Sequence, residues 1–383
     1  MTAVATKERA NAKAEAEEMK LTIDRGDLFR ALTHAAAIVE RRNTIPVLSN
    51  VLLEAAGDKL KITSTDLDLQ IALTVAATIE GEGSTTVSAQ LLHGIVREMA
   101  DGSQVELAMI DGRLEVRSGR SNYKLQVLKA DRFPVLPIGN ATSTFSLPAA
   151  DLLRSLRRVE FAQSTEETRY YLRGILTEVV DGKLFFVATD GNALGFTTLP
   201  APSGATVENA ILPTKLVVTL AKLLDEIDGD VRLFFNDKRA TFEIGSTVLT
   251  GKLVDGAFPN WRRVLPVVQG NPLRIETDTL ESAIRRATIV ATERTRSVTI
   301  ELSKDKLTAS CSSAEHGNAV EEAPCAWDGG EFRVGFNATK LLSAIKASGA
   351  EQIQLDLIDD ATPPIISNPA DDSAKWVVTT MRV

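Results

Sequence analysis

The stretch KLTIDRGDLFRAL, residues 20–32, decides the fold, because it recurs twice along the chain. It returns as TFSLPAADLLRSL at 144–156 and as PLRIETDTLESAI at 272–284, at offsets of 124 and 128 residues. In each copy apolar and polar residues first alternate, as in a strand with one buried face. Apolar residues then follow at the i, i+4 spacing of a buried helix side, as Leu28 and Leu32 do in the first copy. Repetition at this period predicts three similar domains. The residues expected to cap the three helices are Asp27, Asp151 and Thr279.

The same strand–turn–helix unit recurs once more inside each third of the chain. It reads TVSAQLLHGIV at 86–96, AILPTKLVVTL at 210–220 and RVGFNATKLLSAI at 333–345. Each of the six units, roughly 62 residues long, has one helix and leaves room for several strands. The clean alternation of these strands favours antiparallel sheets with one exposed face. We therefore predict an α+β fold of three tandem similar domains, each a doubled β-α-β unit with two helices.

Two proline-bearing segments separate the thirds. They read DRFPVLPIGN at 131–140 and AFPNWRRVLPVVQGNP at 257–272, and an X-Pro step ends regular structure. The predicted domains are accordingly residues 19–142, 143–269 and 270–383.

The composition excludes several classes of protein. No apolar run approaches the ~18 residues of a membrane helix, and residues 1–18 lack the apolar centre of a signal peptide. We expect these first residues to form a disordered extension of a cytoplasmic protein. Cys311 and Cys325 fit a reducing compartment, and a chain with 43 basic and 51 acidic residues has no overall basic coat.

No motif for catalysis or cofactor binding is found. The chain has no G-x-x-x-x-G-K-[ST] loop, no H-E-x-x-H pair and no G-x-S-x-G elbow. Its three histidines and two cysteines are scattered, which argues against a zinc site. We predict a protein without catalytic activity, cofactor or metal.

Positive charge is concentrated on the predicted helices. The six helix windows together carry +8, which leaves −16 for the rest of a chain whose net charge is −8. A positive helical face would bind phosphates without reading bases. The alternative is that these cations are ordinary solvated helix faces.

Two carboxylates allow a second alternative. Thr65-Asp66 recurs as Thr189-Asp190, and this repetition favours a structural turn over a metal site. A metal-dependent nuclease that uses Asp66 and Asp190 remains a competing hypothesis, as does an open, monomeric repeat adaptor with a basic DNA-binding groove.

From Met19 to Val383 the chain resembles the β sliding clamps, the processivity subunits of bacterial DNA polymerase III. The resemblance is carried by RNTIPVLSNVLLEA from Arg42, TSTDLDLQ from Thr63, VATDGNALGF from Val187, KLVDGAFPNWRRVLP from Lys252 and VVTTMRV from Val377. It implies a head-to-tail homodimer that closes into a ring, with helices lining a hole around double-stranded DNA of any sequence. It also implies that DNA polymerase III, other polymerases, the clamp loader and repair proteins bind through short linear motifs.

The resemblance implies a hydrophobic peptide cleft between the second and third domains. Carried over residue by residue, the cleft comprises Leu172, Thr189, Gly191, Asn192, Ala193, Leu194, Pro259, Arg263, Val264, Thr362, Pro364, Val377, Thr379, Thr380 and Met381. Leu172, Leu194 and Val264 could equally belong to an interdomain core. The chain departs from the family where Asn192-Ala193 replaces His-Arg and Thr379-Thr380-Met381 replaces Met-Pro-Met.

Two further surfaces follow from the resemblance alone. The residues expected to contact DNA are Arg42, Tyr170 and Tyr171, with Arg169 in a structural role. The residues expected at the dimer interface are Arg120, Tyr123 and Leu125 on one protomer and Ile289 and Val290 on the other, with Arg120 near Glu315, Glu321 or Glu322.

Overall fold

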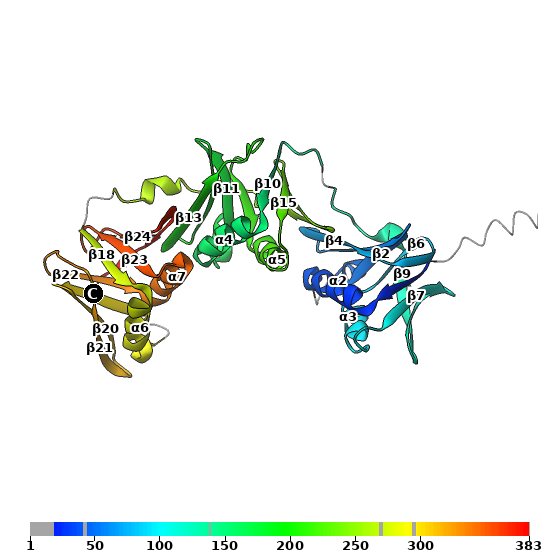
Figure 1. Cartoon of the computed structure of the whole chain (residues 1–383), viewed down its shortest axis with the longest axis horizontal. Coiled ribbons are helices and arrows are strands. Elements are labelled where there is room, and N and C mark those ends of the chain that lie inside the picture. Colours follow the sequence, from blue (N-terminus) through cyan, green and yellow to red (C-terminus); the bar gives the residue numbers. More distant parts are fainter. Residues whose placement is uncertain (1–18, 41–43, 138, 268–270, 293–295, 383) are drawn as a thin grey trace, which may run out of the picture. The chain divides into compact units, whose positions relative to one another are not determined.

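The computed structural model describes residues 19–382 except 41–43, 138, 268–270 and 293–295 (Figure 1). The chain forms two compact units. The first contains the residues up to Ala141 together with Val231–Leu233 and Arg239–Lys252, and the second contains the remainder. No helix among the described residues is long and apolar enough to cross a membrane.

Among its described residues, the first unit contains one antiparallel sheet and two α-helices. The sheet order is β16-β17-β4-β3-β2-β6-β9-β8-β7-β1-β5. Its elements are β1 (Lys20–Asp24), α2 (Arg25–Ile38), β2 (Asn50–Ala56), β3 (Lys59–Thr65), β4 (Leu69–Ala76), β5 (Thr78–Gly81), β6 (Gly83–Ser88), α3 (Ala89–Arg97), β7 (Gln104–Ile110), β8 (Arg113–Ser118), β9 (Ser121–Leu128), β16 (Arg239–Ile244) and β17 (Thr247–Lys252).

Helices α2 and α3 pack against each other, and α2 also packs on β3 and β4 (Figure 1). The buried side of α2 includes Leu28 and Leu32, the i, i+4 pair expected from the sequence. Hairpin β16–β17 extends the sheet, because Gly251 pairs with Leu69 and Thr247 with Leu73. The division into three domains at the predicted boundaries stays a prediction, since this hairpin lies in the predicted middle domain.

The described part of the second unit contains an eight-stranded and a five-stranded sheet. Their orders are β14-β11-β12-β13-β25-β24-β23-β18 and β21-β20-β19-β22-β26. Strand β15 (Asp230–Phe235) is divided between the two units. The other elements are β10 (Ser143–Pro148), α4 (Ala149–Val159), β11 (Gly174–Val180), β12 (Lys183–Thr189), β13 (Ala193–Pro200), β14 (Ala210–Pro213), α5 (Thr214–Leu224), β18 (Asn271–Glu276), α6 (Thr277–Ala287), β19 (Ser297–Ser303), β20 (Lys306–Ser313), β21 (Gly317–Pro324), β22 (Phe332–Asn337), α7 (Ala338–Ser348), β23 (Gln352–Leu357), β24 (Ile365–Asn368), β25 (Asp371–Val378) and β26 (Thr380–Met381).

The α+β prediction is confirmed. Helices α4 and α5, and likewise α6 and α7, pack in pairs as α2 and α3 do. The helices that open the repeats begin at Arg25, Ala149 and Thr277, at the same point of each copy. All three follow a strand directly, as the change from period two to period 3.6 indicates.

The predicted helix caps are wrong by three residues. Helix α2 is capped by Asp24, whose Oδ1 accepts hydrogen bonds from the backbone N–H groups of Gly26 at 2.7 Å and Asp27 at 3.2 Å. Helices α4 and α6 begin after Pro148 and Glu276 without a side-chain cap bond. Asp27, Asp151 and Thr279 therefore lie inside the first turn, where the two carboxylates favour the positive end of the helix dipole.

Candidate peptide-binding site

A tight turn joins β12 to β13 at the centre of the predicted cleft. The Thr189 hydroxyl donates to the Ala193 carbonyl at 2.8 Å and accepts from the Gly191 N–H at 3.1 Å. The Asp190 Oδ1 accepts from the N–H groups of Asn192 and Ala193, both at 2.8 Å. Gly191 has φ +88°, which glycine adopts without strain.

The first repeat contains the same turn. The Asp66 Oδ1 accepts from Asp68 N–H at 2.9 Å and Leu69 N–H at 2.7 Å, and the Thr65 hydroxyl donates to the Leu69 carbonyl. The predicted structural role of Asp66 and Asp190 is thereby confirmed. Within the described part of the chain, no cluster of three or more His, Cys, Asp or Glu side chains could hold a metal.

Strand pairing brings the C-terminal segment beside this turn. In the β13–β25 ladder Ala193 pairs with Val378 and Leu194 with Val377. The ladder continues into the turn, where the Asn192 carbonyl accepts from the Thr379 N–H at 2.9 Å and from its hydroxyl at 3.1 Å. Residues of the second and third repeats thus form one continuous surface.

A buried apolar cluster lies under this surface. Leu194 and Val377 are 3% and 5% exposed and pack with Trp261, which the sequence places in the linker. The remaining buried members are Leu176, Val187, Ile211 and Ile365. The cluster supports the core interpretation for Leu194, because its side chain already contacts buried neighbours.

The linker is anchored by Trp261 at the start of a short 3₁₀ helix, Trp261–Val264. Its ring lies 5.0 Å from the Phe196 ring, and its Nε1 donates to Glu178 at 3.1 Å. Arg262 donates to the same carboxylate at 2.7 Å, and its guanidinium lies 4.3 Å from the Trp261 ring centroid. With Trp261 and Arg262 held on the sheet, Arg263 and Val264 stay exposed.

The predicted cleft residues fall into three groups by exposure. The buried residues pack beneath the surface and support it, and the exposed residues are those that a ligand could contact. Buried are Leu172, Thr189, Ala193, Leu194, Pro364 and Val377; half-buried are Thr362, Thr379 and Thr380; exposed are Gly191, Asn192, Pro259, Arg263, Val264 and Met381. The exposed apolar anchors are Val264 at 60% and Met381 at 41%.

The C-terminal residues form the edge strand β26. Thr380 pairs with Phe336 and Met381 with Gly335, which holds Met381 at the surface. An open depression of about 560 Å³ lies here. It is lined by Arg333, Val334, Gly335, Asp360, Ala361, Thr380, Met381 and Arg382.

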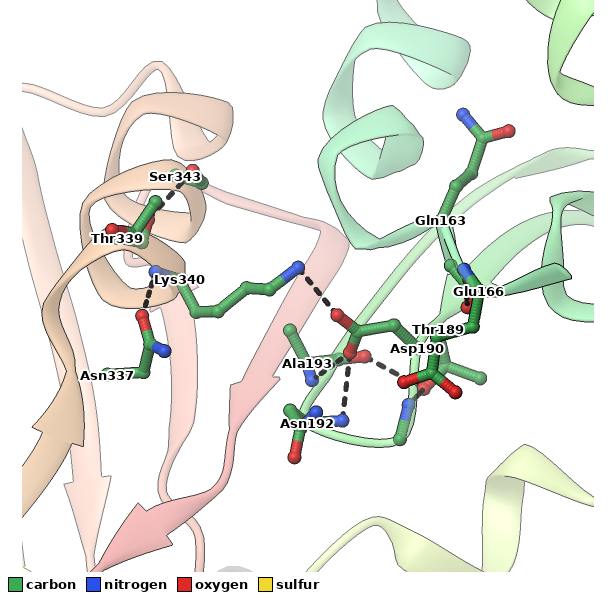
Figure 2. A network of polar contacts seen from close by, with 12 residues as sticks. Gln163, Glu166, Thr189, Asp190, Asn192, Ala193, Asn337, Thr339, Lys340 and Ser343 are labelled. Atoms are coloured by element: carbon green, nitrogen blue, oxygen red, sulfur yellow. Dashed lines mark hydrogen bonds and ion pairs between the residues drawn. The ribbon is translucent and has the colours of Figure 1, made fainter. Parts of the chain in front are cut away.

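An interaction of the Asp190 turn was missed from the sequence. Lys340 Nζ on α7 lies 2.5 Å from the second carboxylate oxygen of Asp190 (Figure 2). Their side chains are 25% and 13% exposed. No local pattern relates residues so far apart, so only the folded structure reveals the pair.

The predicted DNA-contact residues are partly described. Tyr170 is 54% exposed on the 3₁₀ helix Glu167–Leu172, and its ring meets that of Tyr171 edge to face at 5.7 Å. Arg169 pairs with Glu166 at 2.9 Å and donates to the Asp190 carbonyl at 3.1 Å, in agreement with its predicted structural role. Arg42 lies outside the described residues.

Several cations of the helices have acidic partners. Arg154 pairs with Asp151, and Arg157 with Asp225 at 3.0 Å. These cations and Lys346 border a depression of about 750 Å³ between α4 and α7. The positive helical face is therefore weaker than the residue types alone suggest.

The predicted interface residues differ in exposure. Tyr123 on β9 is 38% exposed, but Leu125 is 7% exposed and belongs to the core of its own sheet. In the second unit Ile289 is 77% exposed and Val290 is half-buried. Arg120 is exposed, and of its three expected partners Glu321 pairs with Arg286 and Glu322 with Lys306 within the chain.

Each unit has a strand edge that suits pairing. Among the described strands, β9 pairs with β6 only through residues 127 and 128, and its residues 121–126 pair on one side alone, with β8. In the second unit β21 is the last strand of its sheet, and Val320 on it is 63% exposed. Such edges are templates for pairing with another chain.

Comparisons with known proteins cover the whole repeat region. Three family models of the DNA polymerase III beta subunit match, the N-terminal domain at residues 19–137, the central domain at 146–260 and the C-terminal domain at 262–382. The β sliding clamp of Caulobacter vibrioides is 38% identical over 372 residues, and that of Escherichia coli K12 is 33% identical over 366 residues. Each alignment covers 95% of this chain and all of the relative.

Solved structures agree with this match. A sliding clamp from Bartonella birtlesii bound to griselimycin superposes with a TM-score of 0.93 at 35% identity, covering 96% of this chain and all of that one. The Caulobacter crescentus clamp superposes with a TM-score of 0.90 at 38% identity, covering 95% of this chain and all of that one. The chain therefore belongs to the family of DNA polymerase III beta subunits, the β sliding clamps.

Proposed function

We propose that two copies of this chain join head to tail into a ring around duplex DNA, and that the ring tethers the replicative polymerase for processive synthesis. The observation that carries this proposal is the match of all three family domains, in order, to residues 19–382. The chain acts as a scaffold without catalysis of its own. The nuclease alternative has lost its basis, because Asp66 and Asp190 both hold turns.

DNA is held by enclosure rather than by tight contacts. Cations on the helices, several of them paired with carboxylates, give a modest attraction to phosphates that does not depend on base sequence. Tyr170 adds an exposed ring that can stack on an unpaired base. Weak contacts of this kind permit sliding, and bacterial replication places the ring in the cytoplasm.

Ring closure uses the two strand edges. The free edge of β9 beside Tyr123 on one protomer pairs with the edge of β21 on the other, and Ile289 and Val290 cover the junction. Because two different surfaces meet, the contact is heterologous, and a rotation that closes produces a ring. The exposed side chains of Tyr123, Val320 and Ile289 support this assignment. Leu125, a buried residue of β9, contributes indirectly by packing that strand against the core of its own unit.

Partners bind at the cleft formed by the Asp190 turn, the linker and the C-terminal segment. Short peptides with apolar ends from DNA polymerase III, other polymerases, the clamp loader and repair proteins would contact the exposed side chains of Val264 and Met381. These two residues follow Trp261 and Val377, members of the buried apolar cluster, by three and four positions along the chain. The Bartonella birtlesii clamp binds griselimycin, and we propose that this compound occupies the cleft of the present chain, which makes it a probe of this surface.

The decisive experiment compares circular and linear DNA. The chain is loaded with a clamp loader and ATP onto a nicked plasmid, and half of the sample is then cut once. Retention on the circle and loss from the linear form are expected of an enclosing ring. Equal retention on both would instead support the open monomeric adaptor. The mass in solution is a second discriminator, at 41.3 kDa for a monomer or twice that for the ring.

A further inference from the structure

The Asp190 turn is held from two directions by the third repeat. On one side the Asn192 carbonyl accepts two hydrogen bonds from Thr379 in the C-terminal segment. On the other side Lys340 reaches from the first turn of α7 to the Asp190 carboxylate at 2.5 Å (Figure 2). The position of the turn is therefore set by contacts outside its own hairpin.

The two carboxylate oxygens of Asp190 bind different partners. Oδ1 accepts the N–H groups of Asn192 and Ala193, and Oδ2 accepts the Lys340 ammonium. A charge-assisted bond to one oxygen restrains the whole carboxylate, and with it the two amides that hydrogen-bond to the other oxygen. The pair is mostly removed from solvent, so salt screens it less than a surface pair.

The location of Lys340 is unfavourable for the helix that carries it. Asn337 caps α7 by accepting the Lys340 N–H at 3.1 Å, so the lysine lies in the first turn. Cations are disfavoured there by the helix dipole. Helices α2, α4 and α6 have an acidic residue in their first turn, whereas α5, the equivalent helix of the second repeat, has Lys215 there. The Asp190 carboxylate offsets this cost for Lys340.

We propose that Lys340 is a positioning residue of the peptide cleft, which through Asp190 holds the backbone of Asn192 and Ala193 in the arrangement that the ligand requires. This inference rests on the proposed function of the cleft. It adds a residue outside the predicted set, and it makes helix α7 part of the binding surface's support.

The test compares four variants with wild type in the full-length protein. Lys340→Met keeps the side-chain length and removes the charge, Lys340→Arg keeps the charge, and Asp190→Asn keeps an acceptor for the two amides. Lys346→Met is the matched control, since it removes the same charge from the last turn of the same helix. The probe is fluorescently labelled griselimycin, followed by anisotropy.

Lys340→Met and Asp190→Asn should each weaken binding about three- to tenfold, the size of effect expected for one partly buried charged contact. The two changes combined should weaken it no more than either alone. Lys340→Arg should bind within about twofold of wild type, and Lys346→Met should bind as wild type does.

Hydrogen exchange supplies the readout that separates positioning from direct contact. In Lys340→Met the amides of Asn192 and Ala193 should exchange faster, whereas those of Asp68 and Leu69, in the equivalent turn of the first repeat, should not change. Unchanged exchange together with weakened binding would show that Lys340 contacts the ligand directly, and would overturn the positioning role.

The remaining outcomes are also decisive. Equal affinity of wild type and Lys340→Met, or an equal loss in Lys346→Met, overturns the inference and leaves the cleft standing. Failure of wild type itself to bind griselimycin removes both the inference and the proposed cleft.

Discussion

Arg158 on α4 and Asp371 at the start of β25 form an ion pair with 2.5 Å between Nη2 and Oδ2, which ties the second repeat to the third. Arg158 is also held by Ser373, to which it donates at 2.8 Å, and by Trp376, whose Nε1 donates to its carbonyl at 2.7 Å. Helix α4 contains three arginines, and one of them, Arg158, therefore stabilises the contact between the second and third repeats instead of adding charge to an exposed helix face.

This pair predicts a loss of stability in acid. Burial raises the pKa of Asp371, but hydrogen bonds from Ser373 and the charge of Arg158 outweigh burial and lower the pKa to about 2. Because this value lies below the ordinary 3.8, the carboxylate stabilises the folded state above pH 4, and that contribution is lost as the pH falls through about 2. After allowance for solvent screening, the contribution is about 1–2 kcal/mol.

Asp371→Asn should lower the free energy of unfolding at pH 7 by about that amount and flatten its pH dependence between pH 4 and 2. Denaturant titrations at several pH values measure this. Asp372→Asn, at the exposed neighbouring position, is the control that removes the same charge. A pH profile of Asp371→Asn identical to that of wild type would contradict the assignment.

Gly191 should tolerate no side chain. At φ +88° any other residue is strained, and an added Cβ would lie 3.1 Å from the Arg169 guanidinium. Gly191→Ala should cost about 1 kcal/mol of stability and weaken griselimycin binding by displacing the turn. Gly182→Ala is a suitable control, since it has φ +70° but no neighbour within 4 Å of the added Cβ. If both variants bind equally well, the turn geometry does not matter for binding.

Met381 should be the main apolar anchor at the C-terminal side of the cleft. Met381→Ala, or deletion of residues 379–383, should weaken binding by more than about 1 kcal/mol, because such sites concentrate energy in a few apolar contacts. Restoring the family residue at the exposed position, with Asn192→His, should strengthen binding. Titration of labelled griselimycin measures each change, and equal affinities throughout would remove the cleft assignment while leaving the ring.

The interface should be broken most cleanly at Ile289. Its side chain is 77% exposed in the single chain, so Ile289→Lys should not disturb the monomer but should bury an unpaired charge in the dimer. Sedimentation should then show a folded 41.3 kDa species. Val267→Lys, at a position 74% exposed, should remain a dimer. A dimeric Ile289→Lys protein would place the interface elsewhere. Leu125→Lys is unsuitable, because Leu125 is buried in the single chain and its loss would unfold the domain.

The periodicity of apolar residues in the sequence was sufficient to predict the α+β repeat architecture. The i, i+4 pair Leu28 and Leu32 lies on the buried face of α2 as predicted, and helices begin at equivalent points of each repeat. The Thr-Asp turns could be anticipated as well, since a short polar side chain and the amides it accepts lie within three residues. These features depend on residues that are close together in the sequence, so the sequence by itself determined them.

The tertiary structure decided what depends on distant partners. Whether Leu125 faces out or in follows from the register of its sheet, and a cap at Asp24 rather than Asp27 follows from where the strand before the helix ends. The pairs Lys340–Asp190 and Arg158–Asp371 join segments that no local pattern relates. A partly buried charge is stabilised only where folding brings its partner within bonding distance, and for that reason only the folded chain reveals these two pairs.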